Sequence, residues 1–394
     1  MVKYIILFLL SFFATSWIFK KTLKVALMKN IVDNPDARKL QRQPVPVLGG
    51  VAVFWGMLVS LVVCNMYFAA DWILVVLGLM TVMLYIGTLD DLLSLSPYFR
   101  FILEVLVIFV MITCNDNSIN NFHGLWEIWW MPSWTSMLVT IIACVGIINA
   151  INMIDGVNGL CSGYCIVTCF FFAMTFWFCH NFEATAMAII AIGALIPFFL
   201  HNVFGKKSKM FMGDGGSLLM GITMSVFVVE LLNDRTDFFV RYCPDLGVVP
   251  LALALLSIPV FDTLRVMIMR IVRGRSPFSP DKTHLHHLFL DYNFSHIGTT
   301  ISVIGLNVLV ILSWALAYYL GASIEMQLYV VALMAFSFTF VFYPAMRMIE
   351  RKGGRLYLLL KKFGRATHVG HTKGFIMITN FLDRNCDYET ESQA

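Results

Sequence analysis

Eleven long apolar runs dominate this sequence and limit what it can fold into. Each comes close to the roughly 20 residues that a helix needs to cross the hydrocarbon core of a bilayer. Inside lipid a backbone satisfies its hydrogen bonds only in helices or closed barrels, and solid runs lack the alternation of barrel strands. The sequence therefore predicts an all-α, polytopic membrane protein with about 11 transmembrane helices. We place them at residues 2–19, 47–69, 72–88, 99–114, 134–150, 160–180, 184–201, 216–232, 248–269, 298–320 and 325–345.

The composition supports the membrane class. Only 13% of the 394 residues are charged, whereas soluble proteins carry about 25%. The mean hydropathy of +0.78 is correspondingly high.

Lysine and arginine predict the orientation, because loops rich in them stay on the cytoplasmic side. With the N-terminus outside, the inner loops and the C-terminal tail hold all but three of the 28 Lys and Arg residues, the exceptions being Lys3, Arg235 and Arg241. We therefore expect the N-terminus outside and the C-terminus in the cytoplasm. A positive cluster follows the first run instead of preceding it, which favours an uncleaved anchor helix over a secretory signal. No basic patch indicates a nucleic-acid partner.

We divide the chain into an integral membrane domain at 1–345 and a basic cytoplasmic tail at 346–394. The tail mixes basic residues with leucines in the stretch RKGGRLYLLLKKFGR, residues 351–365. This composition favours contact with anionic inner-leaflet lipids.

Five polar stretches interrupt the apolar runs, and in this orientation all five lie on the inner face. Two of them have unusual spacing: Asp90 and Asp91 are adjacent, and Asn149, Asn152 and Asp155 recur every three residues. The stretches are DNPDARKLQRQPVPVLGG (33–50), GTLDDLLSL (87–95), NAINMIDGVNGL (149–160), KMFMGDGGSLLMG (209–221) and RIVRGRSPFSPDKTHLHHLF (270–289).

Each stretch by itself has an ordinary structural explanation. An aspartate such as Asp214 at a helix start is usually a cap. Asn152 can bond a neighbouring helix, and the pair at Asp90 can be a solvated turn. The arginines can have the sole role of setting the orientation of the protein in the membrane, and the histidines can lie in an exposed loop. Five such stretches on one face of an apolar protein favour a shared site.

The residue types in these stretches indicate a phosphate-bearing ligand and a divalent cation. Adjacent carboxylates repel each other in a partly dry site unless a cation is present. Mg²⁺ takes one or two carboxylates together with phosphate oxygens. Glycine-rich helix starts, arginine and protonated histidine all favour anions. At a membrane surface, this combination predicts one lipid reactant and one cytosolic nucleotide.

These stretches resemble the motifs of the polyprenyl-phosphate N-acetylhexosamine-1-phosphate transferases. The resemblance covers about residues 15 to 345. It implies an enzyme of the bacterial inner membrane, with its active site on the cytoplasmic face, that transfers a sugar-1-phosphate from a UDP-N-acetylhexosamine to undecaprenyl phosphate and releases UMP. The implied cofactor is Mg²⁺, with Mn²⁺ as an alternative. The motifs are VPVLGG, GTLDD, NAINMIDGVNGL, FMGDGGSLLMG and SPFSPDKTHLHH.

The resemblance also implies roles for individual residues. Asp214 matches the metal-binding aspartate and Asn152 a second metal ligand. Asp90 matches the aspartate proposed to engage or deprotonate the lipid phosphate, and Asp91 its catalytic partner. The residues that match substrate-binding positions are Phe211, which stacks on uracil, Asp155 and Asn158 in the nucleotide-binding stretch, and Arg270, His284, His286 and His287 around the sugar and diphosphate.

Several points stay open at the level of sequence. The form HLHH resembles the branch that uses UDP-N-acetylglucosamine, which supplies lipid-linked surface glycans such as O-antigen or common antigen. UDP-MurNAc-pentapeptide is the alternative donor, and Asn158 stands where many bacterial members have Asp.

A secondary transporter is the alternative of another class, but Glu104 and Asp262 have nearby basic partners in Arg100 and Arg265, which disfavours a translocation path. The sequence does not decide whether the protein is a homodimer.

Overall fold

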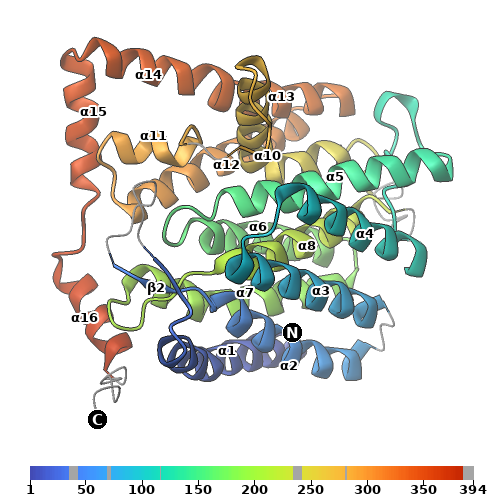
Figure 1. The fold of residues 1–394 in the computed structure, drawn as a ribbon. Coiled ribbons are helices and arrows are strands. Elements are labelled where there is room, and N and C mark those ends of the chain that lie inside the picture. Colours follow the sequence, from blue (N-terminus) through green and yellow to red (C-terminus); the bar gives the residue numbers. More distant parts are fainter. Residues whose placement is uncertain (35–42, 69–71, 116, 234–241, 280–281, 385–394) are drawn as a thin grey trace.

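The computed structural model describes residues 1–34, 43–68, 72–115, 117–233, 242–279 and 282–384 (Figure 1). Its regular structure is helical, apart from two short antiparallel strands that pair Val32 with Pro46 and Asp33 with Val45. The elements are α1 (Val2–Met28), β1 (Val32–Asp33), β2 (Val45–Pro46), α2 (Gly49–Phe68), α3 (Trp72–Leu93), α4 (Pro97–Asn115), η1 (Leu125–Glu127), α5 (Ser133–Met153), α6 (Leu160–Phe178), α7 (Phe182–Phe204), α8 (Gly213–Leu231), α10 (Val248–Val272), α11 (Leu285–Asp291), α12 (His296–Tyr319), α13 (Ile324–Phe336), η2 (Ser337–Val341), α14 (Phe342–Lys352), α15 (Arg355–Ala366) and α16 (Lys373–Asp383).

The prediction of an all-α polytopic membrane protein is confirmed. Within the described residues, 11 helices are long and apolar enough to cross a membrane, and each corresponds to one predicted run. The last span continues from α13 through a π-helical turn into α14, so it reaches Lys352 and is longer than predicted. Helices α3 and α5 also extend past their apolar runs, to Leu93 and Met153. These extensions place Asp90, Asp91 and Asn152 on helix ends.

Helix α8 forms the centre of the bundle. About 94% of its apolar window is buried, and it packs against α2, α3 and α5. Small residues make this close packing feasible, as they commonly do between membrane helices. A Cβ on Gly221, for example, would lie 2.7 Å from Cα of Ile148 on α5. The central position of α8 brings its first turn, GDGG, to the point where several helix ends meet.

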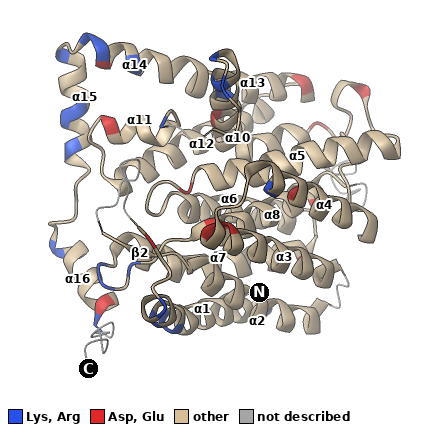
Figure 2. Ribbon diagram, in the orientation of Figure 1, with Lys and Arg blue, Asp and Glu red and all other residues tan. Residues whose placement is uncertain are grey.

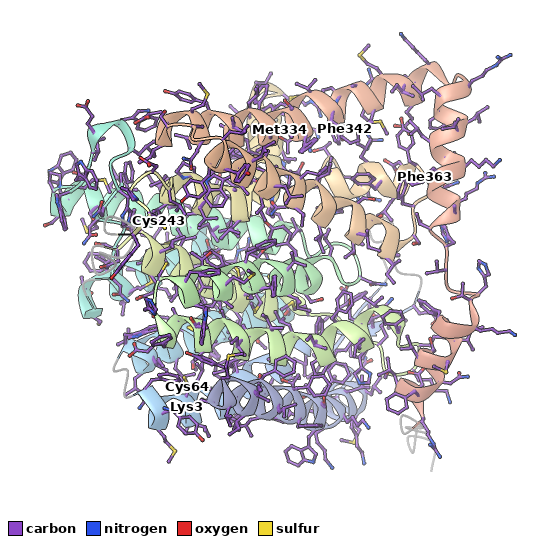
Figure 3. All side chains as sticks on the ribbon, turned by 180° about the vertical axis from the view of Figure 1, so that it is seen from behind. Lys3, Cys64, Cys243, Met334, Phe342 and Phe363 are labelled. Atoms are coloured by element: carbon purple, nitrogen blue, oxygen red, sulfur yellow. The ribbon has the colours of Figure 1, made fainter. Side chains whose placement is uncertain are left out.

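The two ends of the bundle differ in charge. Figure 2 shows Lys and Arg gathered along α15, α16 and the end of α1 at one end of the molecule. Figure 3 shows Lys3, near the start of α1, at the opposite end from α15. The beginning of α1 and the C-terminal helices therefore lie at opposite ends of the bundle.

Candidate active site

Three helix ends meet backbone to backbone because glycines stand at their contacts. A Cβ on Gly87 of α3 would lie 2.4 Å from the carbonyl oxygen of Asp214, and one on Gly50 of α2 would lie 2.3 Å from Cα of Gly216. Real Cβ atoms do not approach other heavy atoms so closely. Glycine therefore allows the ends of α2 and α3 to reach the first turn of α8, and it brings the Asp90–Asp91 pair beside Asp214.

Asp91 caps helix α8 from the end of α3. Its carboxylate accepts hydrogen bonds from the backbone N–H groups of Asp214 (3.0 Å) and Gly215 (3.3 Å). Residue Gly213 precedes them at a φ of +72°, and a Cβ there would collide with the Asp91 carboxylate. Asp214 therefore does not cap its own helix, and the Asp91 carboxylate already accepts these two N–H groups.

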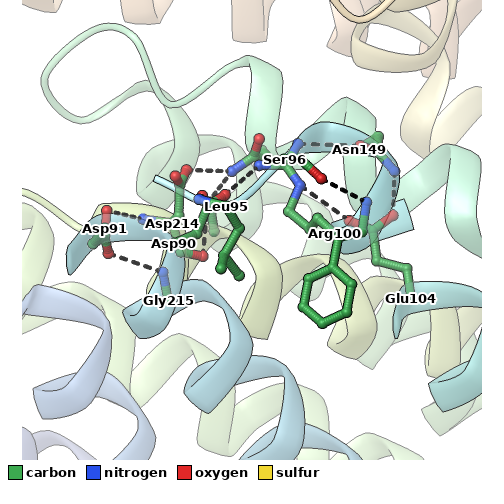
Figure 4. A network of polar contacts seen from close by, with 12 residues as sticks. Asp90, Asp91, Leu95, Ser96, Arg100, Glu104, Asn149, Asp214 and Gly215 are labelled. Carbon is green, nitrogen blue, oxygen red and sulfur yellow. Dashed lines mark hydrogen bonds and ion pairs between the residues drawn. The ribbon is translucent and has the colours of Figure 1, made fainter. Parts of the chain in front are cut away.

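Asp90 belongs to a second network beside the first (Figure 4). Its carboxylate accepts hydrogen bonds from Nη1 of Arg100 (2.9 Å) and from the backbone N–H of Leu95 (2.8 Å). The other side of Arg100 faces Glu104, with Nε 3.4 Å from Oε1, and Asn149 donates to the same carboxylate at 2.5 Å. The predicted pairing of Glu104 with Arg100 is confirmed, and Asp90 enters the site as half of an ion pair.

A cavity of about 520 Å³ opens beside these networks. It brings together seven of the predicted residues from four stretches that are far apart in the sequence. Four other predicted residues, Asp90, Arg270, His284 and His286, are not among its lining residues. The predicted residues that line it are Asp91, Asn152, Asp155, Asn158, Phe211, Asp214 and His287, joined by Asp33, Asn202, Lys209 and His296.

Negative charge accumulates on one wall of the cavity. Asn152 donates from Nδ2 to Oδ1 of Asp214 (2.7 Å) and to Oγ of Ser217 (2.8 Å). The pKa of Asp155 is raised well above its ordinary value, first by burial and then by the charges of Asp214 and Asp91. Three carboxylates that disfavour one another's charge in this way constitute an environment that a cation would stabilise.

The donor set fits a hard divalent cation. Carboxylate and amide oxygens are the ligands that Mg²⁺ prefers, and it commonly takes only one or two carboxylates from the protein and the rest from phosphate and water. Within the described residues no three His, Cys, Asp or Glu side chains form a complete metal cage. A cation held by Asp214 and Asn152 would therefore keep open positions for phosphate oxygens.

The histidine stretch is anchored by Asp262 of α10. Its carboxylate binds Nη2 of Arg265 at 2.6 Å and Nδ1 of His284 at 2.9 Å, and it accepts the backbone N–H of Leu285 at 3.1 Å. Asp262, Arg265 and His284 are all nearly completely buried. The predicted pairing of Asp262 with Arg265 is confirmed. His284 holds the start of α11 in place and is not exposed to the cavity.

His286 is buried beside Gly156, a residue that lines the cavity. A Cβ on Gly156 would be 2.7 Å from its Nε2, so the glycine in NMIDG admits the imidazole ring. The pKa of His286 lies well below its ordinary value, chiefly through burial and then through the neighbouring His287 and His284. Burial therefore favours the neutral form of the His286 imidazole. His287, the third histidine, reaches the cavity wall.

Arg270 is buried at the end of α10 and shapes the loop that follows. Its Nη1 donates to the carbonyl oxygen of Pro277 at 2.5 Å. Phe278, next in the chain, packs against Tyr98 and Phe101 of α4, with ring centroids 5.7 and 6.0 Å apart. The motif residues Pro280 and Asp281 and residues 35–42 of the first polar stretch lie outside the described residues.

Sequence reasoning assigned no role to four polar residues of the cavity, one of which, Asp33, lies in the first polar stretch. Lys209 extends over the ring of Phe211, with Nζ 5.6 Å from the centroid. Its position in the KMFMGDGG stretch could have identified it as a candidate site residue. Asn202 accepts the N–H of Gly159 (2.6 Å) and donates to the carbonyl of Met210 (2.8 Å). His296 accepts the N–H of Asn158 at 3.2 Å. The last two are isolated residues at helix ends, and no motif marked them.

The fold and this cavity define a multi-pass helical membrane protein with an acidic, glycine-lined site suited to a phosphate ligand. A family model described as glycosyl transferase family 4 matches residues 73–232. The chain belongs to this family, and the resemblance to polyprenyl-phosphate sugar-1-phosphate transferases is confirmed.

Individual relatives extend the comparison beyond the family model. The undecaprenyl-phosphate alpha-N-acetylglucosaminyl 1-phosphate transferase of Salmonella typhi is 30% identical over 72% of this chain and 75% of its own length. The protein of that name from Escherichia coli (strain K12) is 31% identical over 69% and 72%. A probable undecaprenyl-phosphate N-acetylglucosaminyl 1-phosphate transferase of Bacillus subtilis (strain 168) is 26% identical over 75% and 80%.

Proposed function

We propose that this protein transfers N-acetylglucosamine-1-phosphate from UDP-N-acetylglucosamine to undecaprenyl phosphate and releases UMP. The observation that carries the proposal is the convergence of GTLDD, NMIDGVNG, FMGDGG and His287 on one cavity. The names of the relatives support the polyprenyl-phosphate acceptor and the sugar-1-phosphate class of reaction. The cavity volume of about 520 Å³ lies within the range of small-ligand sites.

The residues around the cavity support the following reaction. An oxygen of the lipid phosphate attacks the sugar-bearing phosphorus of the donor, a new P–O bond forms, and the P–O bond to UMP breaks. A phosphate monoester has a second pKa near 6, so the acceptor is mostly dianionic at pH 7 and needs no strong base. Asp90, already paired with Arg100, positions this acceptor through the ion pair and does not take its proton.

The other side chains bind the donor. Phe211 offers its ring to uracil, and Asn158 and Asp155, which line the same cavity, contact the nucleotide. Lys209 and His287 supply positive charge or hydrogen bonds to the diphosphate. Asp214 and Asn152 would hold Mg²⁺, or Mn²⁺ in its place, and such an ion neutralises charge that develops on the phosphate oxygens.

The charge distribution supports a place in the bacterial inner membrane, with this cavity on the cytoplasmic face. The cavity and the basic C-terminal helices lie at the same end of the bundle, since α16 bonds the loop that precedes Lys209. The product would be the first lipid-linked sugar of a surface glycan, such as O-antigen or common antigen.

A donor series tests the proposal. Purified protein is incubated with undecaprenyl phosphate, Mg²⁺ and either UDP-N-acetylglucosamine or UDP-MurNAc-pentapeptide, and UMP release and product mass are measured. We expect UMP only with UDP-N-acetylglucosamine, a lipid product heavier by one N-acetylglucosamine phosphate, and loss of activity in EDTA. Release with the pentapeptide donor alone would assign the other branch, and no release with either donor would refute the reaction.

A further inference from the structure

The last described helix, α16, makes a concentrated polar contact with a loop of the bundle. The carboxylate of Asp383 accepts backbone N–H groups of three consecutive residues, Lys206 (3.1 Å), Lys207 (3.1 Å) and Ser208 (3.0 Å). It also accepts the hydroxyl of Ser208 at 2.6 Å. Three successive N–H groups that converge on one anion form a nest, which fixes the backbone conformation of the loop.

Two further contacts hold α16 against the same loop. The hydroxyl of Thr379 donates to the carbonyl of Phe204 at 2.8 Å. The ring of Phe375 packs on that of Phe204, with centroids 5.0 Å apart. Helix α16 therefore contacts both the end of α7 and the loop that follows it.

This loop leads directly into the cavity. Ser208 is fully buried, and the next residues along the chain include Lys209 and Phe211, both of which line the cavity. Beyond the loop, the chain is fixed by the N–H of Phe211, which donates to the carbonyl of Pro46 at 2.7 Å. Asp383 is thus the anchor on one side of Lys209, and Pro46 is the anchor on the other.

The preceding helix, α15, contacts a second segment at the cavity. Thr367, just after α15, accepts the N–H of Ser295 at 2.9 Å through its hydroxyl, and its carbonyl accepts the Ser295 hydroxyl at 2.7 Å. Ser295 is the N-cap of α12, and the next residue, His296, lines the cavity. Figure 3 shows Phe363 of α15 on the side that faces the bundle, where it packs on Phe294 at 5.9 Å.

Electrostatics favour the charged form of Asp383. Partial burial acts to raise its pKa, but the hydrogen bonds from Ser208, Lys207 and Lys206 outweigh burial and lower the pKa below its ordinary value. The contact is therefore a charge-assisted one at neutral pH, stronger than bonds between neutral groups.

We propose that residues 355–383 form a strap that holds two walls of the cavity in position, with Asp383 as the positioning residue for Lys209 and Phe211. The strap touches neither of the reacting groups. It acts on the donor side of the site, because the loop it fixes carries the side chains that face the nucleotide. This inference rests on the proposed function for the identity of the donor.

The test compares Asp383→Ala with Glu350→Gln, which alters another carboxylate of the C-terminal helices that pairs with Arg347. We expect Asp383→Ala to raise the KM for the UDP-sugar about tenfold, as the loss of charge-assisted hydrogen bonds predicts. The kcat and the KM for undecaprenyl phosphate should stay within about twofold of the wild type. Glu350→Gln should change none of the three, and Asp383→Glu should restore part of the donor KM.

A second measurement does not depend on activity. Lys206 and Lys207 are exposed trypsin sites within the loop that Asp383 holds, so Asp383→Ala should speed cleavage after them while Glu350→Gln should not. An unchanged donor KM, or equal changes in donor KM, acceptor KM and kcat, would overturn the proposal, as would unchanged cleavage. If the wild-type protein releases no UMP, the proposed function fails, and the cleavage rates still decide whether the strap holds the loop.

Discussion

Two clusters, one around a buried carboxyl group and one of three half-buried carboxyl groups, lie at the same end of the bundle and differ in how their charge is balanced. We call Asp262, with Arg265 and His284, the paired cluster, and Asp91, Asp155 and Asp214 the cavity cluster. Asp262 has a guanidinium at 2.6 Å and an imidazole at 2.9 Å. In the part of the chain that the structure describes, none of the three cavity carboxylates forms a salt bridge to Lys or Arg.

The difference separates a structural role from a ligand-binding one. The paired cluster is complete within the protein, and its hydrogen bonds fix the start of α11, which carries the histidines. The cavity cluster is held in place by hydrogen bonds from Asn152 and from the first turn of α8, yet its negative charge is in excess. Such an arrangement is stable only when some charge is lost to protons or balanced by a bound cation.

The largest expected effect comes from breaking the paired cluster. Asp262→Ala leaves Arg265 buried without its partner, and removal of one member of a buried pair costs about 3–5 kcal/mol. We expect a large fall in the midpoint temperature of unfolding in detergent. The double variant Asp262→Leu with Arg265→Met should recover much of the loss, because no buried charge remains in it. Equal instability of single and double variants would contradict this account of the cluster.

Removal of charge from the cavity cluster should instead reduce activity. Asp214→Asn keeps the size of the side chain, so the unfolding midpoint should stay close to that of the wild type. UMP release should fall by about 100-fold or more, as expected when one preorganised electrostatic group is lost. Added Mg²⁺ should raise the unfolding temperature of the wild type more than that of the variant. An active Asp214→Asn enzyme would remove Asp214 from the proposed metal site.

The smallest effect concerns Asp91, which is both a cap of α8 and a member of the cavity cluster. Asparagine caps helix starts about as well as aspartate, whereas alanine costs about 1 kcal/mol. Asp91→Ala should therefore unfold at a lower temperature than Asp91→Asn. Because both variants remove the negative charge, the difference between their unfolding temperatures measures the contribution of the helix cap alone. Identical stability would mean that the hydrogen bonds to Asp214 and Gly215 contribute little.

Hydropathy predicted the membrane spans well because each span is a local property of the chain. A run of apolar residues has to form a helix in lipid whatever its neighbours do. The helix ends were less predictable. The end of α3 passes beyond its apolar run to Leu93, and Asp90 and Asp91 there are stabilised by Arg100 and by the first turn of α8, which are partners from elsewhere in the chain.

The glycines also show that the sequence does not reveal contacts between distant parts of the chain. Their clustering was visible, and the natural interpretation was a backbone that approaches a phosphate. In the structure Gly50, Gly87 and Gly215 face other backbones or side chains of the protein, so they serve the packing of helix ends. A glycine in a sequence indicates a close approach, but only the fold reveals what approaches it.

The sequence alone determined the eleven spans, the end of the bundle where polar residues gather and the types of residue available for chemistry. These follow from the transfer of apolar and charged groups between lipid and water, which depends on composition along the chain. Tertiary structure alone decided which carboxylates face the cavity, which histidines are buried and which basic groups are already paired. Those outcomes depend on distances of a few ångströms between residues from different helices, since hydrogen bonds and desolvation act only at that range.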